Sequence, residues 1–337
     1  MQTLDKKQLD QFLAVLSEDA RVFVPADQNG LTQFVPYTLI QQGQAQMVWS
    51  QNTTVAPKSI FLPQTEAIYA YKAQGKDLAV AQIPPDEQPQ VIFAMRHCDV
   101  QAIVCLDKVF LDPRYVDAQY AQKREKTTVF ALRCNQPKAT CFCTSMGVDP
   151  EKADASAADV EVYDLGEQYA FEALTDKGTA VLTKASRLLN EQPVQLPPVA
   201  ERSLQVPTEG LPEKLSGLFD APLWDNWMFK CLGCGTCTYI CPTCHCFDLT
   251  NKQRGEVGVK LRTWDSCMFE EYTLMAGGHN PRPGKKERVR NRFLHKLEYF
   301  NERHGMFLCV GCGRCIKKCP MNIDITKFIQ QVMTEEV

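Results

Sequence analysis

The sequence predicts an α/β N-terminal domain with a small, mostly parallel sheet, followed by a mainly α-helical C-terminal domain rich in cysteine. Three observations predict this arrangement. Short apolar runs alternate with helix-like segments in the first half of the chain, which is the pattern of βαβ units. Residues 191–212 contain five prolines and no sustained apolar period, so we expect a linker there. Beyond this linker, cysteines gather in two tight groups.

The N-terminal domain is assigned to residues 1–190. Residues 4–17 carry leucine and phenylalanine side chains at helical spacing, which predicts an opening amphipathic helix. Short strand-like runs follow at residues 21–25, 34–39 and 78–83.

A strand–helix–strand pattern comes next. Residues 91–95 (VIFAM) form the continuous apolar run of a strand buried on both faces. Asp99 is placed to cap a helix over residues 100–110. Residues 127–132 (TTVFAL) predict a second strand, parallel to the first.

Charge and length exclude several classes of protein. The chain has 337 residues with 37 Lys+Arg and 40 Asp+Glu, a formal net charge of −3, which argues against a nucleic-acid groove or a polybasic membrane anchor. No run approaches the roughly 18 consecutive apolar residues of a membrane helix. The first residues lack the pattern of a signal peptide. We therefore expect a cytoplasmic protein with no nucleic-acid partner and no membrane partner.

The chain contains 16 cysteines, and in a reducing cytosol such a number indicates metal ligation before disulfides. They fall in three groups, at residues 98–143, 231–267 and 309–319.

Two of these groups repeat one motif, C-x2-C-x2-C-x3-C followed by proline, which ends at Pro242 and again at Pro320. This is the bacterial ferredoxin run, in which three cysteines bind one [4Fe–4S] cube and the fourth binds the other cube. One cluster is then assigned to Cys231, Cys234, Cys237 and Cys319, and the other to Cys309, Cys312, Cys315 and Cys241. A zinc ribbon is the alternative, but zinc sites use paired C-x2-C knuckles rather than four cysteines in one run.

The C-terminal domain is assigned to residues 213–337, with a ferredoxin-like dicluster architecture and an insertion over residues 247–308. Within the insertion, a basic helix is predicted at residues 285–304, and its apolar stripe is interpreted as core packing. The lysines and arginines of this helix form either a solvated face or a group of cations that compensates the negative charge of the clusters.

Three further cysteines lie outside the two motifs. We expect Cys244, Cys246 and Cys267 to pack as buried thiols near the clusters. As an alternative they hold a further cube, which needs a fourth ligand such as His245 or His279.

The N-terminal cysteines predict a third [4Fe–4S] cluster. Cys98 and Cys134 each follow a predicted parallel strand, so both thiols are expected at the carboxyl edge of the sheet, where open α/β sheets place their ligands. The loop after Cys134 brings Cys141 and Cys143 back to the same edge. Because C-x6-C-x-C is not a standard spacing, four reduced thiols without metal remain the alternative. Cys105 lies within the intervening helix and is expected in the core.

Several common cofactor motifs do not occur. No G-x-G-x-x-G follows a strand, and there is neither a Walker loop nor a G-x-S-x-G elbow. The sequence therefore shows no site for nicotinamide, flavin or nucleotide, and no residue is expected to act as a general acid or base.

Unusual stretches over most of the chain resemble the iron–sulfur beta subunit of cytosolic NAD(P)-linked [NiFe] hydrogenases (sulfhydrogenases) and the related iron–sulfur subunit of anaerobic sulfite reductase. The stretches are FLPQTEAIY (61–69), RHCDVQAI (96–103), CFCTSMG (141–147), CPTCHCFD (241–248), WDSCM (264–268), MAGGHNPRP (275–283) and CVGCGRCIKKCP (309–320). The fourth and fifth are more similar to the hydrogenase branch. One departure is His97, where the family often has proline or alanine.

The resemblance implies two ferredoxin clusters on the eight motif cysteines, and matching N-terminal cysteines at Cys98, Cys134, Cys141 and Cys143. It also implies two partners, a flavoprotein that binds NAD(P)H and FAD and a separate catalytic metal subunit.

The main hypothesis is therefore a non-catalytic electron-transfer subunit of an anaerobic oxidoreductase, with hydrogenase as the complex. The first alternative is the electron-transfer subunit of anaerobic sulfite reductase. The second is a stand-alone iron–sulfur reductase of small sulfur compounds that uses Cys244, Cys246, Cys267 or a cluster with an open iron site. A non-redox role, with structural or sensing clusters, is a third.

Overall fold

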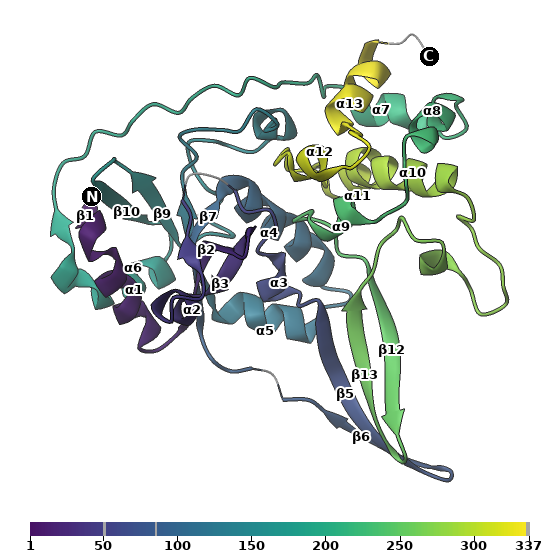
Figure 1. Ribbon diagram of the computed structural model, residues 1–337, viewed down its shortest axis with the longest axis horizontal. Helices are drawn as coiled ribbons and strands as arrows, with labels where there is room; N and C mark the ends of the chain where they lie inside the picture. Colours follow the sequence, from purple (N-terminus) through teal and green to yellow (C-terminus); the bar gives the residue numbers. More distant parts are fainter. Residues whose placement is uncertain (50–51, 85, 335–337) are drawn as a thin grey trace.

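The computed structural model describes residues 1–49, 52–84 and 86–334. Figure 1 shows three parts: a sheet covered by helices, a long β finger that points to the lower right, and a group of helices at the upper right, above the base of the finger. Within the described residues, no helix combines the length and apolar character needed to cross a membrane.

The large sheet has nine strands in the order β11-β1-β10-β9-β8-β7-β2-β3, with β4 paired to β2. The strands are β1 (Gln2–Asp5), β2 (Arg21–Gln28), β3 (Leu31–Pro36), β4 (Gln46–Met47), β7 (Gln90–Arg96), β8 (Thr127–Leu132), β9 (Val160–Asp164), β10 (Gln168–Ala173) and β11 (Asn190–Glu191). Only β2, β7, β8 and β9 are mutually parallel. The sheet is therefore larger than predicted and mixed rather than mostly parallel, because antiparallel strands extend it on both sides.

Helices cover both faces of the large sheet. They are α1 (Leu9–Ser17), α2 (Tyr37–Gln41), α3 (Lys58–Phe61), α4 (His97–Phe110), α5 (Ala118–Lys126) and α6 (Asp176–Lys184), with short 3-10 turns at Lys6–Gln8, Cys143–Met146 and Ser186–Leu188. Phe93 of β7 packs in the core that includes α1, whereas Ile92 packs in the core that includes α4. This two-sided burial confirms the interpretation of residues 91–95.

The pairing of β7 with β8 shifts register between Ile92 and Met95, where Ala94 has a φ of +65°. This bulge lets residues beyond it return to alternate faces of the sheet.

Three local predictions need correction. Residues 2–5 form strand β1 rather than the start of the opening helix, because Leu4 is buried in the core of the sheet. The run at residues 34–39 is divided, since β3 ends at Pro36 and α2 begins at Tyr37. Asp99 does not cap its helix: α4 begins at His97, and Asp99 lies buried in the first turn.

A second sheet forms the finger in Figure 1 and has the order β12-β13-β5-β6. Its strands are β5 (Thr65–Gln74), β6 (Asp77–Gln82), β12 (Phe247–Arg254) and β13 (Val257–Trp264). The strand predicted at residues 78–83 is thus present as β6, fully exposed. Because β5 pairs with β13, a hairpin of the insertion is joined to the N-terminal part of the chain.

Most of the remaining helices pack around a further core that contains Trp224, Trp227, Phe293 and Phe328, whereas Phe300 of α11 packs against α4. The remaining helices are α7 (Leu211–Ser216), α8 (Leu223–Phe229), α9 (Thr236–Tyr239), α10 (Lys285–Leu294), α11 (Phe300–His304), α12 (Arg314–Lys318) and α13 (Ile325–Thr334), with a 3-10 turn at Glu271–Thr273. A π-helical segment, η5 (His295–Tyr299), joins α10 to α11. The basic helix is therefore continuous over residues 285–304 as predicted, and its apolar stripe is buried: Val289, Phe293, Leu297 and Phe300.

Between β11 and α7 the chain forms no helix or strand. It runs from the large sheet to the helical part along the top of the view in Figure 1. The proline-rich stretch lies in this segment.

Candidate iron–sulfur sites

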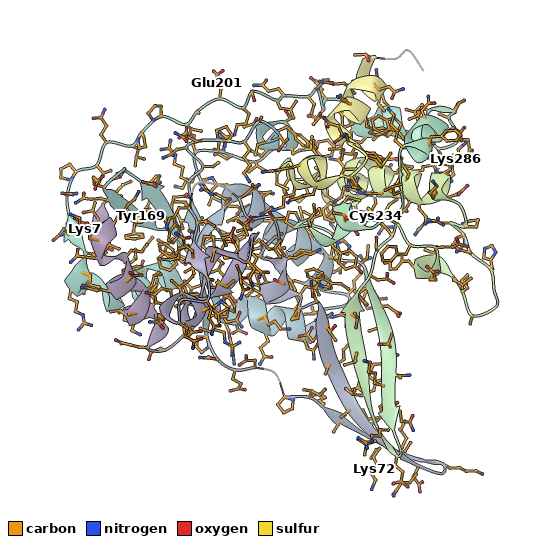
Figure 2. The ribbon with its side chains drawn as sticks, in the orientation of Figure 1. Lys7, Lys72, Tyr169, Glu201, Cys234 and Lys286 are labelled. Atoms are coloured by element: carbon orange, nitrogen blue, oxygen red, sulfur yellow. The ribbon has the colours of Figure 1, made fainter. Side chains whose placement is uncertain are left out.

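The first cysteine motif begins in the loop before α9. Gly233 and Gly235 both adopt left-handed backbone conformations, with φ of +73° and +74°. Such angles are strained for residues with a side chain, so glycine lets the loop turn between successive cysteines. Cys234 is exposed, and Figure 2 places it near the base of the finger, whose far end carries Lys72.

The second motif has the same backbone conformation before α12. Gly311 and Gly313 have φ of +58° and +73°. The two motifs lie close together, since α9 and α12 are in contact.

The eight motif cysteines line two cavities. The first cavity is lined by Cys231, Cys234, Cys237 and Cys319, and also by Cys315. The second is lined by Cys309, Cys312, Cys315 and Cys241. The structure therefore brings each predicted set of four together. Among the described residues, no group of three or more His, Cys, Asp or Glu side chains converges on a single metal ion.

A third cavity is lined by all four N-terminal cysteines singled out by the sequence: Cys98, Cys134, Cys141 and Cys143. Cys98 lies in the first turn of α4, and Cys134 follows the end of β8 with one residue between them. Both are thus at the carboxyl edge of parallel strands, as predicted from their position. Cys105, the fifth N-terminal cysteine, is fully buried in the core beneath α4.

Each pair of neighbouring cavities shares one lining cysteine. Cys312 lines both the N-terminal cavity and the second cavity. Cys315 lines both the second and the first. The second cavity is therefore the middle one of three.

Direct backbone contacts hold the N-terminal cysteine loop against the second motif. The amide of Phe142 donates to the carbonyl oxygen of Gly311 at 2.9 Å. A Cβ atom on Gly311 would lie 2.6 Å from the backbone nitrogen of Cys143, and one on Gly313 would lie 2.7 Å from the carbonyl carbon of Thr140. Only glycine permits this approach.

Two buried cations of the basic helix face the C-terminal cavities. Lys296 is 3% exposed and donates to Cys241 Sγ at 3.3 Å, Thr243 Oγ1 at 3.1 Å and the Leu308 carbonyl at 3.1 Å. Arg292 is 6% exposed and lines both the first and the second cavity. In the described part of the chain, neither makes an ion pair with a carboxylate, and Arg292 Nε has no hydrogen-bond partner.

The pKa values of these cations show which groups balance their charge. Burial lowers the pKa of Lys296, but the charges of Cys241 and other neighbouring cysteines outweigh it and raise the pKa well above its ordinary value. The pKa of Arg292 is raised in the same way against burial, chiefly by Cys237 and Cys315. Buried charges are normally paired. An anionic group held by the surrounding thiolates is the pairing that these residues fit, and a thiolate-bound iron–sulfur cluster is such a group.

Individual thiols differ in how readily they ionise. A hydrogen bond from Cys244, together with Lys296, lowers the pKa of the Cys241 thiol well below its usual value. Burial raises the pKa of Cys309 and Cys315 to about 12. Since the thiolate is the form that binds metal, the contact of Lys296 with Cys241 Sγ favours ligation by this cysteine.

A third buried cation, Arg314, separates the second cavity from α4. Its guanidinium donates to Asp99 Oδ1 at 2.6 Å and to Oδ2 at 2.8 Å, and its Nε donates to the Thr53 carbonyl at 2.6 Å. This bidentate pair explains why Asp99 is buried in α4 rather than capping it.

Cys244, Cys246 and Cys267 pack beside the second cavity. The thiol of Cys244 contacts Cys241, and that of Cys246 contacts Cys267 and Tyr272. A hydrogen bond from Cys267 lowers the pKa of Cys246 to about 6. Of the three residues predicted to pack as buried thiols, Cys267 is buried, whereas Cys244 and Cys246 are half-buried.

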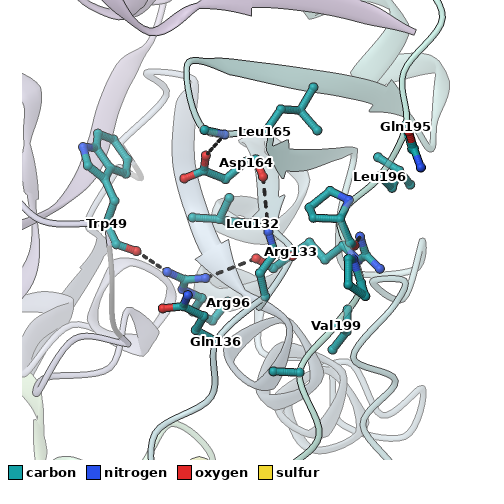
Figure 3. A pocket seen from close by; sticks show the side chains of 15 residues that line it. Trp49, Arg96, Leu132, Arg133, Gln136, Asp164, Leu165, Gln195, Leu196 and Val199 are labelled. Carbon is teal, nitrogen blue, oxygen red and sulfur yellow. Dashed lines mark hydrogen bonds between the residues drawn. The ribbon is translucent and has the colours of Figure 1, made fainter.

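Next to the N-terminal cysteines lies a larger cavity of about 870 Å³, drawn in Figure 3. It extends from the ends of β7, β8 and β9 to residues 195–200 of the linker, and it shares Arg96 and Gln136 with the cysteine cavity. Arg96 donates to the carbonyl oxygens of Trp49 and Arg133.

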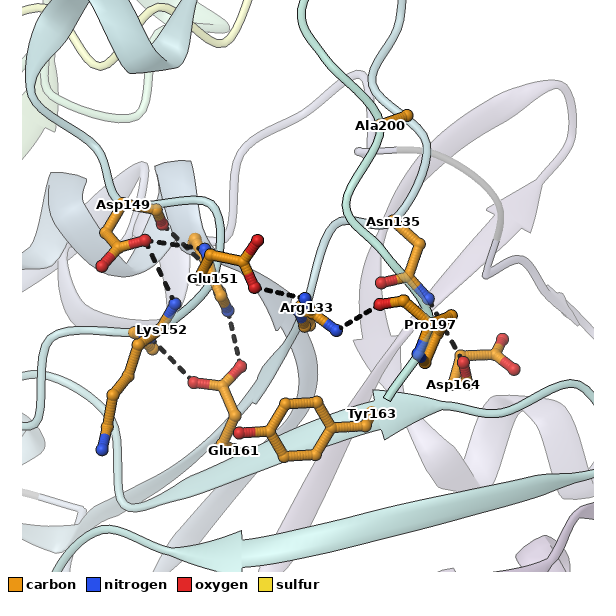
Figure 4. A network of polar contacts seen from close by, with 12 residues as sticks. Arg133, Asn135, Asp149, Glu151, Lys152, Glu161, Tyr163, Asp164, Pro197 and Ala200 are labelled. Atoms are coloured by element: carbon orange, nitrogen blue, oxygen red, sulfur yellow. Dashed lines mark hydrogen bonds and ion pairs between the residues drawn. The ribbon is translucent and has the colours of Figure 1, made fainter. Parts of the chain in front are cut away.

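A polar network fixes the start of α4 beside this cavity (Figure 4). Nε2 of His97 lies 2.6 Å from Glu161 Oε1, and Nδ1 lies 3.1 Å from the Asp149 carbonyl. Arg133 contacts Glu151 and donates to the Pro197 carbonyl at 2.8 Å. His97 therefore positions the turn that carries Cys98.

Sequence reasoning missed the individual roles of Arg292, Lys296 and Arg314. The signal for the first two was present, since they lie one helical turn apart in the basic helix and compensation of cluster charge was one of its two interpretations. Nothing in the sequence pairs Arg314 with Asp99, because 215 residues separate them.

The backbone of the two motifs and the cavities that their cysteines line are those expected of one class of protein, the [4Fe–4S] dicluster proteins. Residues 230–323 match the family model described as a 4Fe-4S dicluster domain. The whole chain is also similar to the Sulfhydrogenase 2 subunit beta of Pyrococcus furiosus, at 30% identity over 341 residues that cover 98% of this chain and 97% of that protein. The chain therefore belongs to the family of sulfhydrogenase beta subunits. No solved structure matches it.

Proposed function

We propose that this chain is the electron-transfer subunit of an anaerobic multisubunit oxidoreductase. It relays single electrons between a partner flavoprotein that binds NAD(P)H and FAD and a second partner with a catalytic metal centre. The observation that carries the proposal is the row of three cysteine-lined cavities joined through Cys312 and Cys315. Similarity to a sulfhydrogenase beta subunit supports hydrogenase as the complex.

The proposed ligands follow the cavities. One [4Fe–4S] cluster is bound by Cys231, Cys234, Cys237 and Cys319, and a second by Cys309, Cys312, Cys315 and Cys241. A third is bound by Cys98, Cys134, Cys141 and Cys143. When bound, such clusters accept and release one electron at a time. The chain's own residues hold them in order.

The first site is the most exposed of the three sites. Cys234 of the first site is exposed, and Leu232 beside it is 62% exposed. Cys134 of the N-terminal site and the four cysteines of the middle site are half-buried, and Phe142, Val310 and the buried cations also line the middle site. The first site is therefore the end at which a partner can approach the row most closely, and the N-terminal site is the opposite end of the row.

The thiol content supports a reducing compartment, so we place the protein in the cytoplasm. The proposal includes neither a nucleic-acid partner nor a membrane partner. Anaerobic sulfite reductase is the alternative complex, and it differs in the catalytic subunit rather than in the role of this chain.

Anaerobic purification of the assembled complex tests the proposal. We expect a flavoprotein and a nickel-containing subunit to co-purify with this chain, whereas a sirohaem protein would indicate sulfite reduction. Cys231→Ala and Cys309→Ala should each abolish electron flow from the flavin to the catalytic subunit. Retained turnover in either variant contradicts the relay.

Iron and acid-labile sulfide counts test the number of clusters. Cys141→Ser should lower the content by about four irons per chain, the iron of one cube. Cys105→Ala is the matched control, because it removes a buried N-terminal thiol outside the three cavities and should leave the iron content unchanged. Equal iron in the Cys141→Ser variant and the wild type would remove the third cluster from the proposal.

A further inference from the structure

The basic helix presents two buried cations to the proposed clusters at unequal positions. Arg292 and Lys296 are separated by one helical turn, and both side chains point into the space between the cysteine motifs. Arg292 lines the first and the middle cavity, whereas Lys296 lines only the middle one. In the described residues no carboxylate pairs with either cation.

Lys296 and Arg292 also differ in the cysteines with which they interact. Lys296 Nζ donates directly to Cys241 Sγ at 3.3 Å, and Cys241 is the proposed fourth ligand of the middle cluster. Arg292 interacts with Cys237 of the first site and with Cys315 and Cys241 of the middle site. Of these two cations, both lie at the middle site, and only Arg292 also lies at the first site.

Reduction adds an electron to a cluster that is already anionic. A fixed positive charge in a buried, low-dielectric position stabilises the reduced form, and a hydrogen bond to a ligand sulfur acts in the same direction. Both effects raise the reduction potential. They act over short distances, so a cation that lines one cavity affects that site most.

We propose that Arg292 and Lys296 set the order of the reduction potentials of the two C-terminal clusters. Arg292 raises the potentials of both C-terminal clusters, and Lys296 further raises that of the cluster bound by Cys309, Cys312, Cys315 and Cys241. The middle cluster thus has the higher potential of these two. This inference rests on the proposed electron-transfer function.

Potentiometric EPR of the anaerobically purified, cluster-loaded chain tests the inference. In Lys296→Met, one midpoint potential should become more negative while the others stay at their wild-type values. In Arg292→Met, two should become more negative. Lys296→Arg keeps the charge and should restore most of the wild-type potential.

Arg288 provides a matched control on the same helix. It is 7% exposed, lies one turn before Arg292, donates to the Pro283 carbonyl at 2.7 Å and lines none of the three cysteine cavities. Arg288→Met removes an equally buried cation and should leave every midpoint potential unchanged. Equal shifts in this variant and in Arg292→Met would show a general charge effect and overturn the inference.

Iron and sulfide content distinguishes failure of the proposed function from failure of the inference. A wild-type chain that binds no iron–sulfur cluster contradicts the proposed function. Loaded Lys296→Met and Arg292→Met chains with unshifted potentials contradict only the inference. If the Lys296→Met chain does not bind its clusters, Lys296→Gln is used instead, because it keeps a polar group in the cavity without the charge. One midpoint potential of this variant should be more negative than in the wild type, and an unshifted value contradicts the inference.

Discussion

The cations near the C-terminal cysteines differ from the cation at the boundary with the N-terminal region in what balances their charge. Arg314 at this boundary is held by both carboxylate oxygens of Asp99, at 2.6 and 2.8 Å. Arg292 and Lys296, within the C-terminal region, are surrounded by cysteine sulfur instead. All three side chains are nearly inaccessible to solvent.

The difference separates a structural charge from one that acts on a bound group. A guanidinium paired with a carboxylate is neutral as a unit, so Arg314 mainly joins α12 to α4. A buried cation that is balanced by cysteine sulfur instead of a carboxylate is stabilised further by an anionic cluster bound to that sulfur. The same kind of side chain therefore has two roles, and variants with effects of decreasing size can test this comparison.

The largest effect is expected from Asp99→Asn, which leaves Arg314 buried without a carboxylate. Breaking a buried pair by removing one partner costs about 3–5 kcal/mol, so the thermal unfolding midpoint should fall strongly. Asp112→Asn is the control, because its partner Arg114 is 78% exposed and surface pairs contribute little. Similar midpoints for the two variants would show that the Arg314 pair is not structural.

A smaller effect is expected where the second motif contacts the N-terminal loop. Gly313→Ala should destabilise the protein by about 2–4 kcal/mol, since it combines a left-handed φ with overlap on Thr140. Gly233→Ala has the same φ of +73° but only a contact at 3.8 Å with the Met268 carbonyl, so about 1 kcal/mol is expected.

Unfolding midpoints and iron counts of both glycine variants measure this difference. Only Gly313→Ala should also reduce the iron content, because the contact positions the loop with Cys141 and Cys143. If the two variants lose equal stability, the close approach of the second motif to the N-terminal loop does not contribute to the free energy of unfolding.

The smallest effect concerns Glu298, two residues beyond Lys296 in the π-helical segment. Burial, and then the charge of Glu302, raises the pKa of Glu298 to about 7. In the unfolded chain the value is about 4.3, so the folded state loses stability as the pH rises from about 4 to about 7. Glu298→Gln removes that loss and should stabilise the protein by about 1–2 kcal/mol at pH 8.

This gain should shrink as the pH is lowered toward about 5.5, where the native carboxyl is already protonated. Unfolding midpoints at the two pH values measure it. Glu125→Gln, at an exposed position of α5, is the control and should change the midpoint little at either pH. A gain for Glu298→Gln that does not depend on pH would assign the effect to packing instead of ionisation.

Much of the candidate site was predictable from local sequence. The two motifs place their cysteines within 11 residues each, and glycines at fixed offsets supply the turns, so spacing alone predicts each set of ligands. The parallel strands β7 and β8 were predictable for a similar reason. Their apolar runs are short and continuous, and the thiols that follow them must lie at one edge of the sheet.

Tertiary structure alone decided which charges meet the cysteines and which segments share a sheet. The pairing of β5 with β13 joins residues nearly 200 positions apart, and Arg314 meets Asp99 across 215 positions. The sequence determined the donor atoms and their local geometry, because these depend on neighbours along the chain. The order of the three cavities and the cations that face them depend on the packing of distant segments, which no local pattern encodes.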